Sequence, residues 1–186
     1  MKELSLNILD IAKNSVTAGA TLVEIAVTEA PDRLTISISD NGCGMTPEFV
    51  ARVTDPFTTT RTTRKVGLGI PLLKMEAQMA GGDLSIESEV GKGTTTSAWF
   101  DPGNIDMPPL GDLNSSILTL IQGHPDTDFL FRHTMDDRVV ELDTRELREV
   151  LEDVPLNSYD VMQWIEGNLQ EQYGELSEDD GHDGEE

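Results

Sequence analysis

The stretch Asp40-Asn41-Gly42-Cys43-Gly44-Met45 directly follows residues 34–39, where apolar residues alternate with Thr and Ser. This alternation predicts a strand with one apolar face, so Asp40 stands at a strand end. The two glycines lack a Cβ and therefore allow a sharp turn and a close approach to a flat ligand. A carboxylate placed there is suited to accept a hydrogen bond from the exocyclic amine of a purine. The alternative is a simple strand-ending turn, for which Asn-Gly is a common signal.

Composition limits the possible partners. The 186 residues have a net charge of −22; residues 1–100 carry 9 Lys/Arg and 12 Asp/Glu, and residues 101–186 carry 4 and 23. Such a surface repels phosphates, so we expect neither nucleic acid nor a membrane as partner. The single cysteine, Cys43, cannot form an internal disulfide. No apolar run approaches the ~20 residues of a membrane span, and no signal-peptide core is present, which favours a cytoplasmic location.

Residues 3–18 are predicted to form a helix with two different sides. The apolar side has a spacing of three or four residues and contains Leu4, Ile8, Ile11 and Ser15. The polar side contains Asn7, Asp10, Asn14 and Thr17. A solvated face is one interpretation of this polar side. The other is a ligand site, in which Asn14 supplies an oxygen to Mg²⁺ and Asp10 positions water.

Residues 55–66 have little periodicity, many hydroxyls and the three cations Arg61, Arg64 and Lys65. Such a segment is typical of a mobile phosphate-binding loop, although a plain polar surface loop has a similar composition. Gly67-Leu68-Gly69 follows and opens a predicted helix over residues 70–80. The free amide hydrogens and positive dipole end of a helix start favour phosphate. Its expected buried residues are Leu72, Leu73, Met75, Met79 and Ala80.

Further strands and one short helix complete the first 100 residues. Residues 21–28 should pair antiparallel with the strand that ends at Asp40, and Thr46 should cap a helix over residues 46–53. Residues 83–90 and 94–100 should form a hairpin around Gly91-Lys92-Gly93. Either Thr94 or Thr95 would then place a hydroxyl near the base held by Asp40.

Taken together, residues 3–100 resemble the Bergerat-fold, or GHKL, ATP-binding domain of gyrase-type topoisomerases, heat-shock chaperones, sensor histidine kinases and mismatch-repair ATPases. The helix with Asp10 and Asn14 is similar to the Asn box, and residues 40–45 are similar to the first glycine box. Gly67-Leu68-Gly69 and Gly91-Lys92-Gly93-Thr94 are similar to the second and third. Three departures from the family pattern leave binding intact and bear on turnover: Lys65 stands where a glycine is usual, Asp10 where hydrolysing members carry Glu, and Thr17 where an acidic or basic residue is often found.

The resemblance implies a fold, cofactors and site residues. The fold is α+β: a two-layer α/β sandwich with a mixed, largely antiparallel sheet covered by helices. ATP and Mg²⁺ are the implied cofactors, with Asn14 as the metal ligand and Asp10 as the catalytic residue that activates water or a hydroxyl. The implied nucleotide-binding residues are Asn14, Asp40, Gly42, Gly44, Met45, Phe57, Thr58, Arg61, Arg64, Lys65, Val66, Gly67, Leu68, Gly69 and Thr95.

The rest of the chain has no recognised motif. We expect a histidine-kinase-like ATP-binding domain over residues 1–100, a linker over 101–111, a small acidic α+β extension over 112–174 and a disordered acidic tail over 175–186. In the extension, helices are predicted over 114–121, 144–152 and 158–173, the last with Val161, Trp164, Ile165 and Leu169 on its buried face. Residues 128–133 and 138–142 should form a hairpin. His124 and His133 are expected to be structural.

Two functions from different classes fit this sequence. The first is an Mg-ATP-dependent enzyme, either a slow ATPase or a kinase that acts on a partner protein. The second is a non-catalytic nucleotide-sensing module, whose ATP lid orders around the nucleotide and controls partner binding. Both require a protein partner, because none of the three histidines lies in the long helical context of a histidine-kinase phosphoacceptor.

Overall fold

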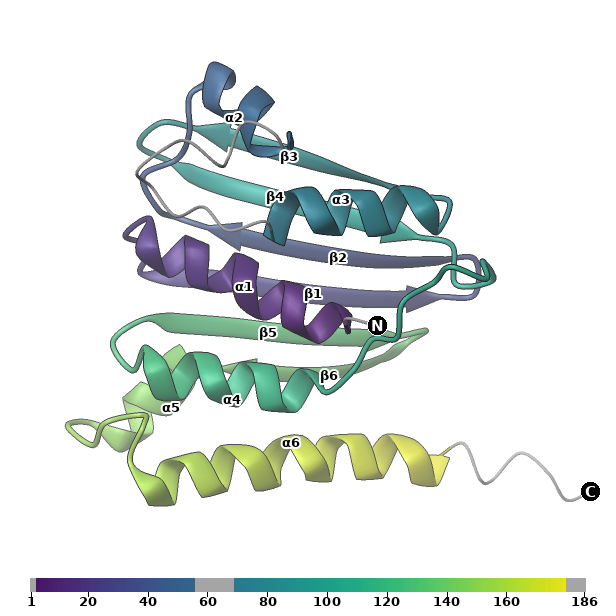
Figure 1. The fold of residues 1–186 in the computed structure, drawn as a ribbon. Coiled ribbons are helices and arrows are strands. Elements are labelled where there is room, and N and C mark those ends of the chain that lie inside the picture. Colours follow the sequence, from purple (N-terminus) through teal and green to yellow (C-terminus); the bar gives the residue numbers. More distant parts are fainter. Residues whose placement is uncertain (1–2, 56–68, 180–186) are drawn as a thin grey trace, which may run out of the picture.

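The computed structural model describes residues 3–55 and 69–179 of the chain, with side chains through Gly174. Its described part is one six-stranded sheet with the order β3-β4-β2-β1-β5-β6. Helices α3, α1, α4 and α6 lie side by side in that order over one face of the sheet (Figure 1). This is the α+β, two-layer architecture of the Bergerat fold, so the prediction of fold class is confirmed.

The central strands form as their alternation predicts. β1 (Leu22–Ala30) and β2 (Arg33–Asp40) pair antiparallel, with Val23 opposite Asp40. β4 (Gly93–Phe100) pairs antiparallel with β2 on one side and with β3 (Asp83–Glu89) on the other. The apolar residues of β2 are buried beneath the helices, whereas its Ser and Thr residues lie on the less covered face. Asp40 is therefore held in the interior of the sheet, between Val23 and Thr94.

The helices also follow the predicted pattern. α1 spans Leu4–Thr17, α2 Pro47–Val53, α3 Gly69–Met79, α4 Leu113–Gly123, α5 Thr144–Leu151 and α6 Tyr159–Asp179. Thr46 caps α2 as expected, because its Oγ1 accepts a hydrogen bond of 3.2 Å from the Phe49 amide.

Three expected core residues are exposed instead. Met75 and Met79 on α3 are 48% and 56% exposed, and Trp164 on α6 is 55% exposed. Ala77, which was not expected in the core, is fully buried. The side of α3 that faces the core is therefore the one that carries Ile70, Leu73 and Ala77. Met75 and Met79 lie outside this side of the helix, so their side chains remain exposed.

The C-terminal segment continues the same sheet. β5 (Asp128–Met135) pairs parallel with β1, and β6 (Arg138–Asp143) pairs antiparallel with β5 in the expected hairpin. The apolar side chains of β5 and α6 belong to the same core cluster as those of α1 and β2. α6 continues to Asp179, five residues into the predicted disordered tail. The boundaries proposed for the domain, linker and extension stay predictions.

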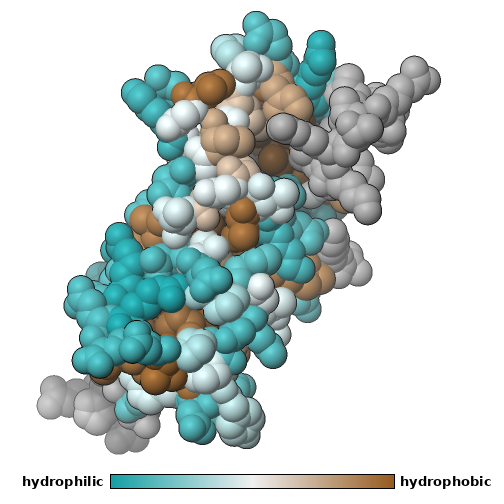
Figure 2. Space-filling view, turned by 90° about the vertical axis from the view of Figure 1, so that its left-hand side faces the viewer, coloured by the Kyte–Doolittle hydropathy of each residue, from teal (hydrophilic) through white to brown (hydrophobic). Residues whose placement is uncertain are grey.

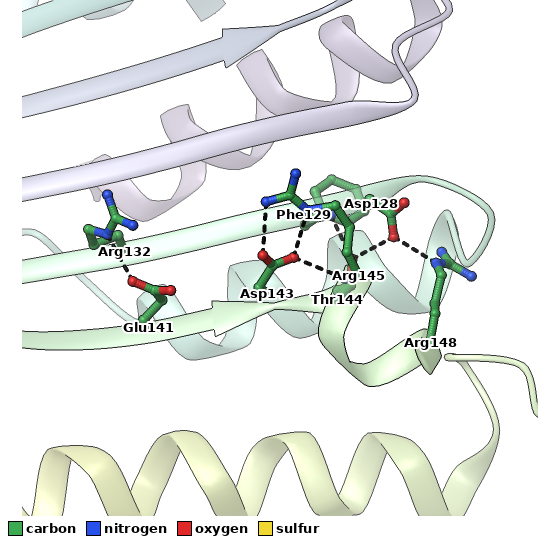
Figure 3. Close-up of polar contacts among 8 residues, drawn as sticks. All are labelled: Asp128, Phe129, Arg132, Glu141, Asp143, Thr144, Arg145 and Arg148. Atoms are coloured by element: carbon green, nitrogen blue, oxygen red, sulfur yellow. Dashed lines mark hydrogen bonds and ion pairs between the residues drawn. The ribbon is translucent and has the colours of Figure 1, made fainter. Parts of the chain in front are cut away.

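Polar contacts fix the start of α5 where β5 begins and β6 ends (Figure 3). The Thr144 hydroxyl donates to Asp128 Oδ1 at 2.9 Å and accepts from the Phe129 amide at 2.9 Å. Arg148 Nε donates to the same Asp128 oxygen at 2.6 Å. The hydrogen bond from the Arg145 side chain lowers the pKa of Asp143 below its usual value. We assign a structural role to these groups, because their hydrogen-bonding atoms are used for contacts with one another.

Candidate nucleotide-binding site

A pocket of about 430 Å³ opens at one end of the sheet, between α1, the loop after β2, α2 and β4. Figure 2 views the molecule from this end: apolar and weakly polar side chains gather in its upper half, and hydrophilic ones dominate the lower half. Residues from four separate parts of the sequence line the pocket: Ile11, Asn14, Ser15, Thr17, Ala18, Asp40, Cys43, Gly44, Met45, Phe49, Val53, Ile70, Thr94 and Thr96. A mostly apolar cavity with a few convergent polar groups is typical of a small-molecule site.

Asp40 is held by two hydrogen bonds to its carboxylate. The Ser15 hydroxyl on α1 donates to Oδ2 at 2.6 Å, and the Gly42 amide donates to Oδ1 at 2.9 Å. The side chain is half-buried and lines the pocket. Each carboxylate oxygen retains a second lone pair. The structure thus presents a fixed hydrogen-bond acceptor to any ligand in the pocket.

The glycines of this region allow protein segments to approach one another. Gly44 has a φ of +72°, and a Cβ on it would lie 2.0 Å from the Glu89 carbonyl oxygen. Gly93 has a φ of +133°, and a Cβ there would lie 1.9 Å from the Asp40 carbonyl oxygen. At Gly42 the nearest atom, 3.0 Å from an added Cβ, is the Ala18 carbonyl oxygen on α1. These glycines let the loop pack on α1 and on the β3–β4 turn, and Gly44 also lines the pocket; the approach of Gly42 and Gly44 to a ligand stays a prediction.

The four residues on the polar side of α1 lie in different surroundings. Asn14 and the largely exposed Thr17 line the pocket, whereas Asn7 is fully buried elsewhere. Asp10 is half-buried and is not among the described residues that line the pocket. It lies beside the start of α3, since a Cβ on Gly69 would come within 3.4 Å of the Asp10 Cβ. Gly69 thus packs against the polar side of α1.

On β4, the hydroxyls that line the pocket are those of Thr94 and Thr96. Thr95, which was expected to contact the nucleotide, is placed elsewhere: its Oγ1 lies 2.7 Å from Ser39 Oγ. Successive side chains of a strand point to opposite faces, so Thr94 and Thr96 share a face that Thr95 does not. The sequence left Thr94 and Thr95 as alternatives, and the structure favours Thr94.

Several predicted ligand contacts lie outside the described residues. They are Phe57, Thr58, Arg61, Arg64, Lys65, Val66, Gly67 and Leu68. Conversely, sequence reasoning missed Ser15, Phe49, Val53, Ile70 and Thr96, all of which line the pocket. Most of them are apolar residues that cannot be told from ordinary core positions in the sequence. Only Ser15 gives a sequence signal, because its hydroxyl falls on the apolar side of the predicted helix.

Among the described residues, the pocket offers few metal ligands of its own, which fits a metal ion that enters together with a phosphate-bearing ligand. Within residues 3–55 and 69–174, no group of three or more His, Cys, Asp or Glu side chains is placed to hold an ion. Asn14 offers a carbonyl oxygen at the pocket wall. Mg²⁺ commonly takes one or two protein oxygens and completes its shell with substrate phosphates and water. Asn14 therefore fits Mg²⁺ bound to a polyphosphate.

The pocket and fold define a member of the nucleotide-binding family described as "Histidine kinase-, DNA gyrase B-, and HSP90-like ATPase". The model of that family matches residues 1–104, and the chain belongs to it. The family match supports ATP as the ligand of the pocket. In the described residues, no helix is long and apolar enough to cross a membrane.

Curated relatives are similar over about half of the chain. They include the sensor histidine kinase AruS of Pseudomonas aeruginosa, which is 30% identical over 109 residues, 54% of this chain and 11% of that protein. Sporulation kinase E of Bacillus subtilis is 33% identical over 94 residues, 50% of this chain and 13% of that protein. The chain thus covers a small part of each relative's length.

Among solved structures, the fold is similar to one titled "Crystal Structure of N terminal domain of a DNA repair protein". The TM-score is 0.53 at 17% sequence identity, over 77% of this chain and 53% of that chain. At this identity the likeness concerns the fold alone. It extends beyond the residues that the family model matches, which agrees with the continuation of the sheet into β5 and β6.

Proposed function

We propose that this chain binds Mg-ATP and uses it on or through a partner protein, as a kinase or a slow ATPase. The observation that carries the proposal is the Asp40 carboxylate, which Ser15 and Gly42 hold at the wall of the pocket. A fixed carboxylate selects adenine because it accepts a hydrogen bond from the exocyclic amine. Guanine presents a carbonyl oxygen at the corresponding position, which would face Asp40 without a donor.

Other residues divide the remaining tasks. Ile11, Met45, Val53 and Ile70 provide apolar surface for the base. Asn14 holds Mg²⁺, and the sequence segment with Arg61, Arg64 and Lys65 binds the phosphates. ATP, when bound, supplies the transferable γ-phosphoryl group. Asp10 accepts a proton from water or from a partner's hydroxyl, at a rate that its short side chain keeps low.

The state of His133 supports a partner as phosphoacceptor. His133 is only 4% exposed, and both its ring nitrogens are engaged: Nδ1 lies 2.8 Å from the Tyr173 hydroxyl and Nε2 lies 2.7 Å from Glu29 Oε2. A phosphoryl group cannot reach such an imidazole without breaking these contacts. The kinase names of AruS and sporulation kinase E and the family match are consistent with action on a protein partner.

The position of Asp10 favours a second function, a non-catalytic nucleotide sensor. Asp10 is not among the described residues that line the pocket, although Asn14, one turn further along α1, is. A carboxylate outside the pocket is poorly placed to activate water. ATP would then change the affinity of the chain for its partner without turnover.

Product analysis with γ-labelled ATP and Mg²⁺ tests these functions. Free phosphate that is lost in Asp10→Asn indicates an ATPase, and label on a co-purified partner indicates a kinase. Saturable ATP binding with neither product indicates the sensor. Equal affinity for ATP and GTP in calorimetry would contradict the adenine contact and with it the proposed function.

A further inference from the structure

Asn7 is a fully buried polar residue of α1 that the pocket does not use. Its side chain is 0% exposed, and its Nδ2 donates to Glu76 Oε2 on α3 at 2.5 Å. Its Oδ1 is also buried and has no hydrogen-bond partner among the described residues. A bond between side chains 69 positions apart in sequence joins two neighbouring helices of the same layer.

The two joined helices are also two walls of the pocket. α1 contributes Asn14 and α3 contributes Ile70, while Gly69 at the start of α3 packs against Asp10. Asn7 lies about one helical turn before Asp10 and two turns before Asn14 on α1. The spacing and register of α1 and α3 at the Asn7–Glu76 contact therefore determine where Gly69 and Ile70 stand relative to Asp10 and Asn14.

A polar pair with one fully buried member is an unusual way to join two packed helices. Burying the Asn7 amide with one oxygen unsatisfied costs free energy that two apolar side chains at these positions would avoid. A hydrogen bond, however, has a direction and a fixed length, so it selects one register where apolar contacts tolerate several. The presence of this costly pair is explained if the nucleotide site requires one particular register of α3 against α1.

We propose that Asn7 and Glu76 are positioning residues, which set the register of α3 against α1 and thereby the phosphate end of the nucleotide site. Neither residue contacts the ligand in this scheme. The inference rests on the proposed function, because it assumes that the phosphates of ATP lie between Asn14 and the start of α3. The hydrogen bonds of the adenine end come from Asp40 on β2 and Ser15 on α1 and not from α3, so adenosine binding should depend much less on the pair than Mg-ATP binding does.

Isosteric substitutions test this proposal without creating a cavity. Asn7→Asp places a carboxylate against the Glu76 carboxylate, so the two helices separate or shift. Glu76→Gln keeps an oxygen that accepts from the Asn7 amide. Combining Asn7→Asp with Glu76→Gln reverses the direction of the hydrogen bond and restores the pair. The readout is calorimetric affinity for Mg-ATP and for adenosine, with thermal unfolding of every variant as the control for folding.

We expect Asn7→Asp to weaken Mg-ATP binding about tenfold while adenosine binding stays within about twofold, the scale of one interaction between contacting residues. Glu76→Gln and the double variant should both stay within about threefold of the wild type for both ligands. An equal loss of ATP and adenosine affinity, unchanged ATP affinity in Asn7→Asp, or no rescue in the double variant would each overturn the proposal. A wild-type chain that binds neither ligand would instead refute the proposed function, and this inference with it.

Discussion

The Ser15 hydroxyl on α1 donates a hydrogen bond of 2.6 Å to Asp40 Oδ2 at the end of β2. This contact joins a helix to a strand 25 positions away in sequence and holds the acceptor of the pocket in one orientation. Sequence periodicity places Ser15 on the apolar side of α1, and the residue is indeed buried. Its hydroxyl nevertheless serves the site, because a buried donor requires an acceptor and Asp40 supplies it.

Ser15→Ala should weaken ATP binding by about 1 kcal/mol, the usual net value of one hydrogen bond, because Asp40 then loses one of its two supports. Isothermal titration calorimetry gives the affinity directly. Ser39→Ala is the matched control, since the Ser39 hydroxyl contacts Thr95 and does not line the pocket. A loss as large in Ser39→Ala as in Ser15→Ala would show that the effect is not specific to Asp40.

Asp40→Asn should weaken ATP binding by about 2–3 kcal/mol, because the acceptor loses its charge and the amide presents a donor to the adenine amine. Fluorescence competition against ADP, ATP and GTP measures the change. Discrimination between ATP and GTP should disappear in this variant. Wild-type affinity for ATP in Asp40→Asn would refute the adenine contact.

Asn14→Ala should remove the Mg²⁺ dependence of ATP affinity and leave adenosine binding nearly unchanged, because the Asn14 carbonyl oxygen is the protein ligand that we assign to the ion. Titrations with and without Mg²⁺ give the dependence. Thr17→Ala is a suitable control, as Thr17 also lines the pocket from α1 but its hydroxyl donates to the Lys13 carbonyl. If Mg²⁺ strengthens binding equally in Asn14→Ala and the wild type, the assignment fails.

Gly93→Ala should destabilise the chain by more than about 3 kcal/mol, because the new Cβ would meet the Asp40 carbonyl oxygen, and such backbone clashes are among the most costly substitutions. Gly91→Ala in the same turn is the matched control. Gly91 also has a positive φ, of +83°, but no atom lies within 4 Å of an added Cβ. It should cost only about 1 kcal/mol of left-handed backbone strain. Urea unfolding compares the two, and equal losses would contradict the close packing of β4 on Asp40.

Stability should decrease in alkaline solution through Tyr173. Burial, followed by the negative charges of Glu29 and Asp112, raises the pKa of this phenol well above its usual value in the folded chain. The unfolded chain releases the proton near its ordinary pKa of about 10, so the stabilisation is present below that pH and is lost as the pH rises above it. Thermal unfolding between about pH 8 and 11 should therefore show a steeper loss in the wild type than in Tyr173→Phe. Parallel curves would contradict this linkage.

Much of the fold follows from local patterns in the sequence. Alternation in residues 34–39 gives β2, and the Thr46-Pro47 signal gives the start of α2, because each depends only on neighbours in the chain. The placement of Asp40 at a strand end follows from this alternation, whereas a shared site for Asp40 and Asn14 was implied by the family resemblance. The exposure of Met75 and Met79 does not follow from local patterns, since it depends on how α3 is rotated against the sheet.

Contacts between distant segments could not be predicted from the sequence. Thr94 and Thr95 are chemically equivalent in a strand pattern, and only the register with Asp40 and Ser39 decides which hydroxyl lines the pocket. Asn7 looks like a member of the polar stripe with Asn14, yet its partner is Glu76. In both cases the deciding neighbour is more than 50 positions away along the chain.

The parallel pairing of β5 with β1 also bears on how this protein is made. Leu22 is opposite Asp128 and Glu29 is opposite Met135, so β1 has no partner on that side until residues 128–135 have been synthesised. The family model ends at residue 104, before that strand. A nascent chain of that length exposes the backbone groups of β1, and such an edge pairs readily with other chains. The sheet that carries the nucleotide-binding segment is thus completed only after residues 128–135, beyond the end of the family module, have left the ribosome.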